Sequence, residues 1–260
     1  MWGRRLFRAI ILIFLLTLVR DGSAAFLEKN VVCPVNSSSA IFSNPAGLGE
    51  LGSLNFSARG GKIFGLSELS YNLIAFSCPQ KRGAVVLGFE GFGKGIYEER
   101  TFIFSFAARF EDLTLGVNLK QLYLDIETVG YLSSFGLDLG LLYLVTDRIK
   151  LNLLGRNLNR PCLGEKLPQE FRFGLCLQPL EDLTLSLDLD KSLKAKIGAE
   201  VKISPLLFIR GSVNQEPSTF TGGLTFRLKR GELDYTYLSH SVLGPTHLFG
   251  ITWKLNYGNN

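Results

Sequence analysis

Apolar and polar side chains alternate along most of this chain, from about residue 51 to residue 257. The segment Leu183–Asp190 shows it most clearly, with leucine at every odd position and Thr, Ser or Asp at every even position. A period of two residues places all four leucines on one face of a strand and the polar side chains on the other. No apolar stripe of helical period competes with this pattern. The alternation therefore predicts β-strands that are apolar on one face only.

The alternating segments, each closed by a turn, predict fourteen strands. They cover residues 51–59, 70–77, 83–91, 101–110, 112–123, 133–145, 148–158, 169–178, 182–190, 194–203, 206–214, 219–229, 232–239 and 247–257. Every other connection is a tight turn, such as Glu111–Asp112, and most of the intervening connections are longer. Short periplasmic turns and longer outer loops are typical of an up-and-down barrel in an outer membrane.

A soluble β-sandwich would also show this alternation, so the scale and purity of the two faces must decide. The apolar faces carry almost no charge, and a soluble fourteen-stranded barrel would have to fill an oversized apolar interior. A membrane barrel turns such faces to lipid and keeps its charges in the lumen. The predicted fold class is thus all-β, a transmembrane antiparallel up-and-down barrel of about fourteen strands. The residues predicted to face the lumen are Arg109, Lys120, Asp138, Arg156, Arg172, Asp188, Glu200, Arg210, Arg227 and Lys254.

Aromatic side chains near strand ends are expected to form interfacial girdles. They are Tyr71, Tyr123, Tyr143, Tyr235, Tyr257 and Trp253.

The first residues have the features of a secretory signal peptide. Three arginines precede an uncharged apolar run, Ala9–Val19, and small residues follow up to Ala25. The run is about half the roughly 20 residues that a membrane-spanning helix needs. We therefore expect residues 1–25 to be a cleaved leader and the mature protein to reside in a bacterial outer membrane.

The net charge and the cysteines indicate little about the function of the protein. The formal charge is +5; without the four arginines and one aspartate of the leader it is 24 − 22, or +2, which gives no reason to expect nucleic acid as a partner. The four cysteines have no metal-binding spacing, and an exported chain could pair them in three ways. Unpaired thiols are the preferred interpretation. The cysteines are Cys33, Cys78, Cys162 and Cys176.

No pattern in the sequence indicates an enzyme, a cofactor or a metal site. His240 and His247 stand alone near the last outer loop, without further ligands or a nucleophile at a recognisable spacing. Asp188 and Asp190 share a strand face, but lumenal charges balanced by nearby bases explain them more simply. The glycine-rich stretch 91–95 is followed by no helix that could help to hold a phosphate.

One motif resembles a known superfamily. Asn44-Pro45-Ala46-Gly47-Leu48, just before the first strand, is similar to the signature that introduces the barrel in FadL-type hydrocarbon transporters and PorV/PorQ-type outer-membrane proteins. The closing hairpin from Leu233 to His247 resembles that of PorV/PorQ members. The resemblance implies a fourteen-stranded barrel over residues 51–260, preceded by a hatch-like segment over residues 26–50. This segment is shorter than usual, so it either obstructs the lumen or only launches the first strand, because Asn-Pro also initiates turns.

Two classes of function remain. The FadL side of the resemblance implies passive transport of small hydrophobic molecules across the outer membrane. The PorV side implies an accessory of a secretion system, or a scaffold whose outer loops hold a secreted protein. The implied partners are the lipid bilayer with either a small hydrophobic solute or a secreted protein, and transport ranks narrowly first.

Overall fold

The computed structural model describes residues 37–215, 218–240 and 242–255. The predicted leader, residues 26–36 of the hatch-like segment, Cys33 and Tyr257 lie outside these ranges. The domain boundaries at residues 25 and 50 therefore stay predictions.

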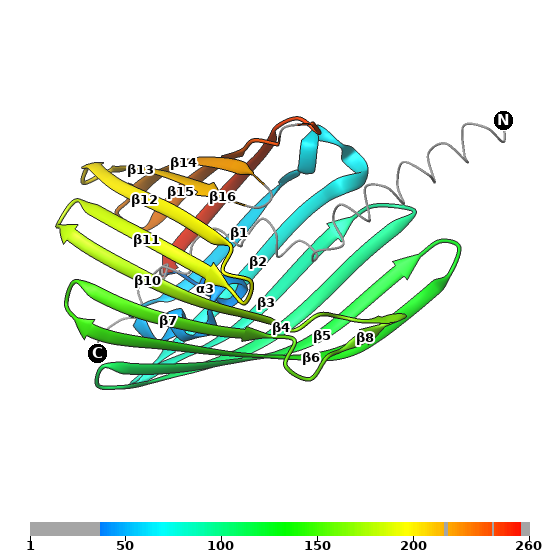
Figure 1. The fold of residues 1–260 in the computed structure, drawn as a ribbon, viewed down its shortest axis with the longest axis horizontal. Helices are drawn as coiled ribbons and strands as arrows, with labels where there is room; N and C mark the ends of the chain where they lie inside the picture. Colours follow the sequence, from blue (N-terminus) through cyan, green and yellow to red (C-terminus); the bar gives the residue numbers. More distant parts are fainter. Residues whose placement is uncertain (1–36, 216–217, 241, 256–260) are drawn as a thin grey trace.

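Fourteen strands form one closed antiparallel barrel (Figure 1). In chain order they are β1 (Leu54–Lys62), β2 (Ser70–Gln80), β3 (Gly83–Gly93), β4 (Tyr97–Phe110), β5 (Leu113–Ile126), β6 (Gly130–Thr146), β7 (Ile149–Arg156), β10 (Glu170–Leu180), β11 (Leu183–Asp190), β12 (Ala195–Ser204), β13 (Leu207–Asn214), β14 (Thr219–Leu228), β15 (Gly231–Leu238) and β16 (Thr246–Leu255). Each strand pairs with its neighbour in the chain, and β1 pairs with β16 to close the barrel. The predicted fold class is confirmed, although β1 begins three residues later, and β4 four residues earlier, than the alternation suggested.

The two ends of the barrel differ in their connections. At one end the strands are joined by two-residue turns, for example at 111–112 and 147–148. At the other end the connections are mostly longer. Residues 63–69 form two 3-10 turns, η2 (Ile63–Gly65) and η3 (Ser67–Leu69), and residues 157–169 contain a small hairpin, β8 (Cys162–Leu163) with β9 (Glu165–Lys166). The short-turn end is the periplasmic end of such barrels, and the other is the outer end.

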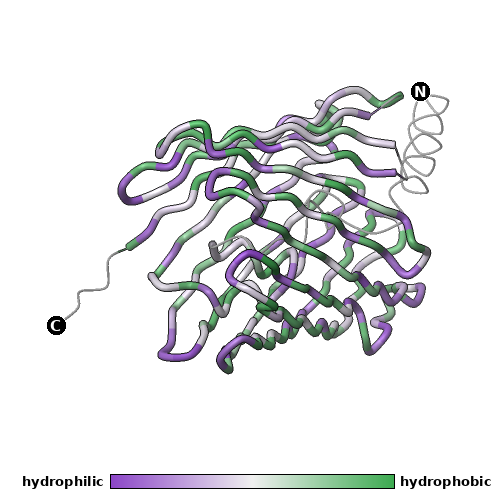
Figure 2. The backbone as a smooth tube through the Cα atoms, turned by 60° about the vertical axis from the view of Figure 1, so that its left-hand side comes forward, coloured by the Kyte–Doolittle hydropathy of each residue, from purple (hydrophilic) through white to green (hydrophobic). Residues whose placement is uncertain are grey.

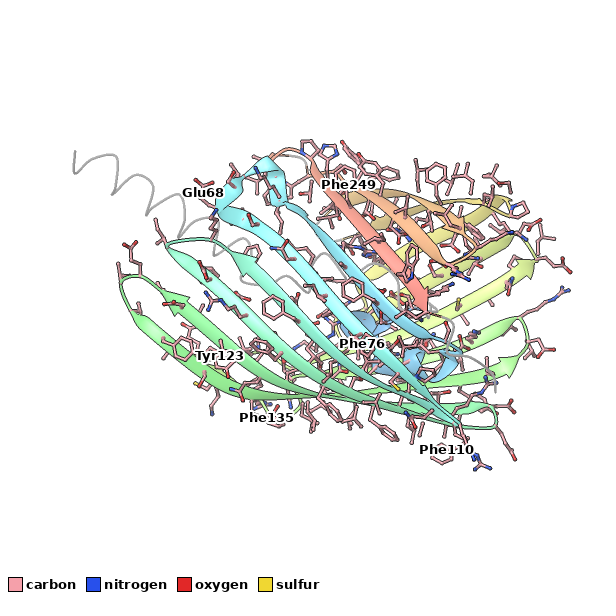
Figure 3. The ribbon with its side chains drawn as sticks, turned by 180° about the vertical axis from the view of Figure 1, so that it is seen from behind. Glu68, Phe76, Phe110, Tyr123, Phe135 and Phe249 are labelled. Carbon is pink, nitrogen blue, oxygen red and sulfur yellow. The ribbon has the colours of Figure 1, made fainter. Side chains whose placement is uncertain are left out.

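The outer surface of the barrel is apolar. Figure 3 shows Phe76, Phe110, Phe135 and Phe249 on the outside, and all four are between 41% and 65% exposed. Along each strand these residues alternate with polar or small ones, as the hydropathy colours of Figure 2 show. Barrels with an apolar outer band and a polar interior are proteins of bacterial outer membranes.

No helix among the described residues is long and apolar enough to cross a membrane.

Two expectations are wrong. Tyr71 does not belong to an outer girdle, because its position in β2 turns its side chain inward, where it is fully buried in the apolar core. The preference for unpaired thiols fails for Cys176, which is disulfide-bonded, whereas Cys78 and Cys162 are free and exposed.

Candidate functional site

A short segment of the chain lies inside the barrel and is here called the plug, Ser37–Glu50. It contains one turn of helix, α3 (Ala40–Ser43), and a 3-10 helix, η1 (Pro45–Glu50) (Figure 1). All five residues of the signature Asn44-Pro45-Ala46-Gly47-Leu48 are buried. The plug sits closest to the inner faces of β3, β4, β5 and β6.

Asn44 sets the turn between the two helices of the plug. Its backbone is extended (φ −139°, ψ 114°), as steric contact with the following proline requires. Its side-chain oxygen accepts a hydrogen bond from the Ala46 backbone N–H at 3.0 Å and so caps η1. Its amide nitrogen donates to the Leu153 carbonyl of β7 at 3.3 Å. One residue therefore both starts η1 and ties it to the barrel wall.

Polar side chains of the wall bind carbonyl groups of α3. Asn118 on β5 donates to the Ile41 carbonyl at 2.8 Å. The Arg156 guanidinium on β7 donates to the Ser43 carbonyl at 3.0 Å and also to that of Phe42. Carbonyls at the end of a helix have no partner within it, so these side chains satisfy groups that burial would otherwise leave unpaired.

The ends of the plug are also held. The Ser38 hydroxyl donates to the Ser57 hydroxyl of β1 at 2.7 Å. At the periplasmic end, the Glu50 carboxylate lies 2.6 Å from the Lys150 ammonium of β7.

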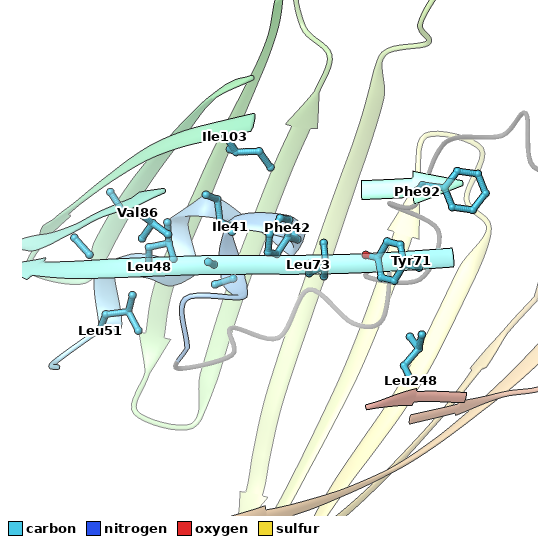
Figure 4. Close-up of a cluster of buried hydrophobic side chains, with 14 of the residues drawn as sticks. Ile41, Phe42, Leu48, Leu51, Tyr71, Leu73, Val86, Phe92, Ile103 and Leu248 are labelled. Carbon is cyan, nitrogen blue, oxygen red and sulfur yellow. The ribbon is translucent and has the colours of Figure 1, made fainter. Parts of the chain in front are cut away.

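The apolar side of the plug packs against the wall from β1 to β4. Figure 4 shows Ile41, Phe42 and Leu48 beside Leu73 and Val86. This apolar core continues toward the outer end through Tyr71, Phe92 and Leu248, and includes Ile63 and Leu69 of the loop between β1 and β2.

Glycines in the wall allow the plug backbone to come close. A Cβ at Gly116 of β5 would lie 2.3 Å from the Pro45 carbonyl carbon, and one at Gly140 of β6 would lie 2.0 Å from the Asn44 side-chain oxygen. Any residue with a side chain at either position would clash sterically with the plug.

The ten charged residues predicted to face the lumen all occupy inner-face positions of their strands. Four belong to the half of the wall beside the plug, and three of these are buried: Arg156, and Lys120 with Asp138, whose charged groups lie 2.7 Å apart. Arg109 lies exposed at the periplasmic end. The other six lie on β10 to β16: Arg172, Asp188, Glu200, Arg210, Arg227 and Lys254.

Charges on β10 to β16 form ion pairs along the wall. Arg210 lies 3.2 Å from Asp234. The Glu232 carboxylate lies 3.0 Å from Arg227 and 2.9 Å from Lys254. These pairs are partly open to water, since the Arg227 side chain is 45% exposed.

A small cavity lies between the plug and the wall formed by β1, β2, β15 and β16. Its volume of about 10 Å³ has room for roughly one water molecule. Ser39 and Phe42 line it from the plug, and Leu73, Asp234 and Thr252 line it from the wall.

Sequence reasoning missed the residues that fit the plug to the wall. Asn118, Asn152 and the two wall glycines attracted no notice, because an uncharged residue on a polar strand face is unremarkable. Asn152 of β7 is 1% exposed, and its amide has no hydrogen-bond partner among the described residues. The inner positions 114, 116 and 118 of β5 are all uncharged, whereas a wall that faces an open lumen would favour charged residues. This run of uncharged residues could have indicated that a protein segment packs there.

Both histidines lie at the outer end. The Nδ1 atom of His240 accepts hydrogen bonds from the Val242 and Leu243 backbone N–H groups at 3.2 and 3.1 Å. His247 lies on the outer face of β16.

No protein-family model and no curated protein sequence matches the chain. Solved structures do match it. The Ralstonia pickettii toluene transporter TbuX has a TM-score of 0.61 at 16% identity, over 85% of this chain and 94% of that one. The CymD monoaromatic hydrocarbon channel has a TM-score of 0.64 at 12% identity, over 86% and 94%. A Pseudomonas aeruginosa FadL homologue has a TM-score of 0.57 at 11% identity, over 87% and 96%.

The chain thus shares the barrel fold of these outer-membrane proteins. None of the three is a PorV-type protein, so that assignment stays a prediction.

Proposed function

We propose that this protein is a passive outer-membrane channel for small hydrophobic molecules, and that the plug must shift within the barrel for a solute to pass. The observation that carries the proposal is the plug itself, which lies inside the barrel and is held on the β1–β7 half of the wall by specific contacts. A segment that only led into β1 would not need hydrogen bonds from Asn118 and Arg156 to its backbone carbonyls.

The fold supports the choice of solute. The three matched proteins include a toluene transporter and a monoaromatic hydrocarbon channel. The apolar wall beside the plug offers a solute of that kind a lining of Leu73, Val86 and Ile103 once the plug moves. A solute of this size would not fit the present cavity of about 10 Å³.

Locking the plug tests the proposal. The Ser38 and Ser57 hydroxyl oxygens lie 2.7 Å apart, so cysteines at both positions are within reach of a disulfide between the plug and β1. The readout is uptake of radiolabelled toluene by intact diderm cells that express the Ser38→Cys/Ser57→Cys protein, the wild type or neither. We expect uptake above the empty cells for the wild type, near-background uptake for the oxidised double variant, and recovery after dithiothreitol.

Each single cysteine variant and the wild type, treated with the same oxidant and reductant, are the controls. They are needed because Cys176 is itself disulfide-bonded. Wild-type rates in an oxidised double variant with the disulfide verified by mass spectrometry would rule out plug movement as the gate. Uptake no greater than in empty cells for every form would rule out hydrocarbon transport.

A further inference from the structure

The seam at which the barrel closes carries an unusual pair on its outer face. Lys62, at the end of β1, lies directly opposite His247 of β16 in the strand register. Both side chains are exposed, and both face away from the lumen at the outer end of the barrel. Directly opposed residues have Cβ atoms about 5 Å apart, so the two side chains can contact one ligand.

The neighbouring strand orients the histidine. The Tyr235 hydroxyl of β15 lies 2.7 Å from His247 Nδ1, and the Tyr237 ring packs edge-on against the imidazole at 5.6 Å. When the hydroxyl donates to Nδ1, the ring proton resides on Nε2, which then offers a donor on the exposed side.

No acid neutralises this pair within the described residues. None of the ion pairs found there includes Lys62. The nearest residues on the outer face of β2 are Ser70, which pairs with Lys62, and Asn72, both uncharged. Glu68, labelled in Figure 3, belongs to the loop η3 and makes no ion pair there.

A second group of charges on the outer face is built differently. Arg100 on β4 forms an ion pair with Glu98, and Asp125 stands opposite Glu98 on β5. That group has its own counter-charges. Within the part of the chain that the structure describes, the Lys62–His247 pair has no such counter-charge and is complementary to an external anion.

Below the pair, the outer face of β1 carries small residues between larger apolar side chains of the neighbouring strands. The outward residues of β1 below Lys62 are the small Gly60 and Ala58. They are flanked by Ile74 of β2 and by Phe249 and Ile251 of β16, which are 44%, 65% and 42% exposed. Figure 3 shows Phe249 standing on the outside of β16. The Asn72 side chain of β2 covers Gly60, since a Cβ at Gly60 would lie 2.9 Å from the Asn72 side-chain oxygen. The apolar strip open to an acyl chain therefore lies beside Ala58.

We propose that this surface binds a phosphate-bearing anionic lipid, with the phosphate between Lys62 and His247 Nε2 and one acyl chain along Ala58, between Ile74 and Ile251. Basic side chains at the membrane surface attract anionic lipid headgroups, and here the donors are fixed by strand pairing. The lipid would bind the strand pair that closes the barrel and stabilise that closure. This site lies on the opposite face of the wall from the plug and does not depend on the transport proposal.

The test measures how phosphatidylglycerol binds to the full barrel in detergent, by native mass spectrometry over a range of lipid concentrations. We expect tighter binding of phosphatidylglycerol than of zwitterionic phosphatidylcholine. Lys62→Gln should weaken the phosphatidylglycerol Kd about fivefold, as loss of one surface charge predicts. Lys62→Gln/His247→Gln should remove the preference over phosphatidylcholine.

Lys94→Gln, which removes one exposed lysine from another outer loop, is the matched control and should leave the Kd unchanged. Heat-modifiable migration on gels establishes that each variant is folded. An unchanged Kd in the double variant would overturn the proposal, as would equal weakening by Lys94→Gln. Binding of inorganic phosphate alone with the same dependence on Lys62 would also overturn it, because the lipid chain would then contribute nothing.

Discussion

The two halves of the barrel wall have the same outer surface but different inner surfaces. From β1 to β7 the inner wall is largely apolar or small and packs on the plug, with Leu73, Ala75 and Val86 almost fully buried. From β10 to β16 it carries Arg210, Arg227 and Lys254 in ion pairs that are partly open to water.

Lipid imposes one requirement on every strand, an apolar outward face, so the outer pattern cannot tell the halves apart. The inner face has no such common requirement. Among the described residues, the β1–β7 half packs on the plug, and the β10–β16 half carries ion pairs that are partly open to water. The same substitution should therefore have different effects in the two halves when it is made inside, and similar effects when it is made outside.

The largest difference is expected from placing a carboxylate inside. Leu48 of the plug is fully buried among apolar side chains, so Leu48→Asp should lower the free energy of unfolding by about 4 kcal/mol or expel the plug. Ser212→Asp on the inner face of β13 should cost about 1 kcal/mol, because Arg210 on the same strand face and Lys196 diagonal to it on β12 can stabilise the charge. Urea unfolding in lipid, with proteinase K digestion of the plug, measures both. Equal costs would contradict the division into two halves.

On the outer face the halves should respond alike. Leu119 of β5 and Leu187 of β11 both lie on lipid-facing positions near the middle of their strands. Each Leu→Arg substitution should cost about 2–4 kcal/mol of unfolding free energy, as expected for arginine near the bilayer midplane. The same urea titration applies. A neutral result at either position would show that its strand face is wrongly assigned.

Glycine-to-alanine changes on the inner wall test the close approach of the plug. Gly116→Ala would place a methyl group 2.3 Å from plug backbone atoms, and overpacking of this kind should cost about 2 kcal/mol. Gly250→Ala in β16 would place a Cβ 3.2 and 3.3 Å from the Arg59 and Asp234 side chains and in ordinary contact, at 3.6 Å, with the Ala58 carbonyl oxygen, so it should cost less than about 1 kcal/mol. Faster toluene uptake is expected for Gly116→Ala alone. If both variants unfold and transport alike, the plug does not rest on β5.

The smallest difference is expected between two arginines. Arg156→Met leaves two plug carbonyls without their donor inside the barrel and should cost about 1.5 kcal/mol. Arg210→Met removes the ion pair with Asp234, in which the Arg210 side chain is 30% exposed. The Thr225 hydroxyl still donates to Asp234 at 2.6 Å. The free energy of unfolding should therefore fall by only about 0.5 kcal/mol. Digestion of the plug should increase only for Arg156→Met. An increase for Arg210→Met alone would reverse the assignment of the two halves.

Three parts of the chain show which features could be predicted from the sequence and which could not. The alternation at Leu183–Asp190 predicted both its strand and its faces, because the strand period of two is a local property. Tyr71 was misplaced, since an aromatic residue at a strand end fits an outer girdle and an inner core equally well until the register is known. Asn44–Leu48 was recognised as a signature, but the sequence left open whether it obstructs the lumen or launches β1.

The sequence by itself determined the strand number, the alternation of faces and the rhythm of short and long connections, because each depends on neighbours within about ten residues. Only the tertiary structure decided that the plug lies inside one half of the barrel, that Asn118 and Arg156 hold it, and that Lys62 meets His247 at the seam. These contacts join residues up to 185 positions apart, as in the pairing of β1 with β16. Closure of the barrel brings them together, and no local pattern records which positions will then face each other.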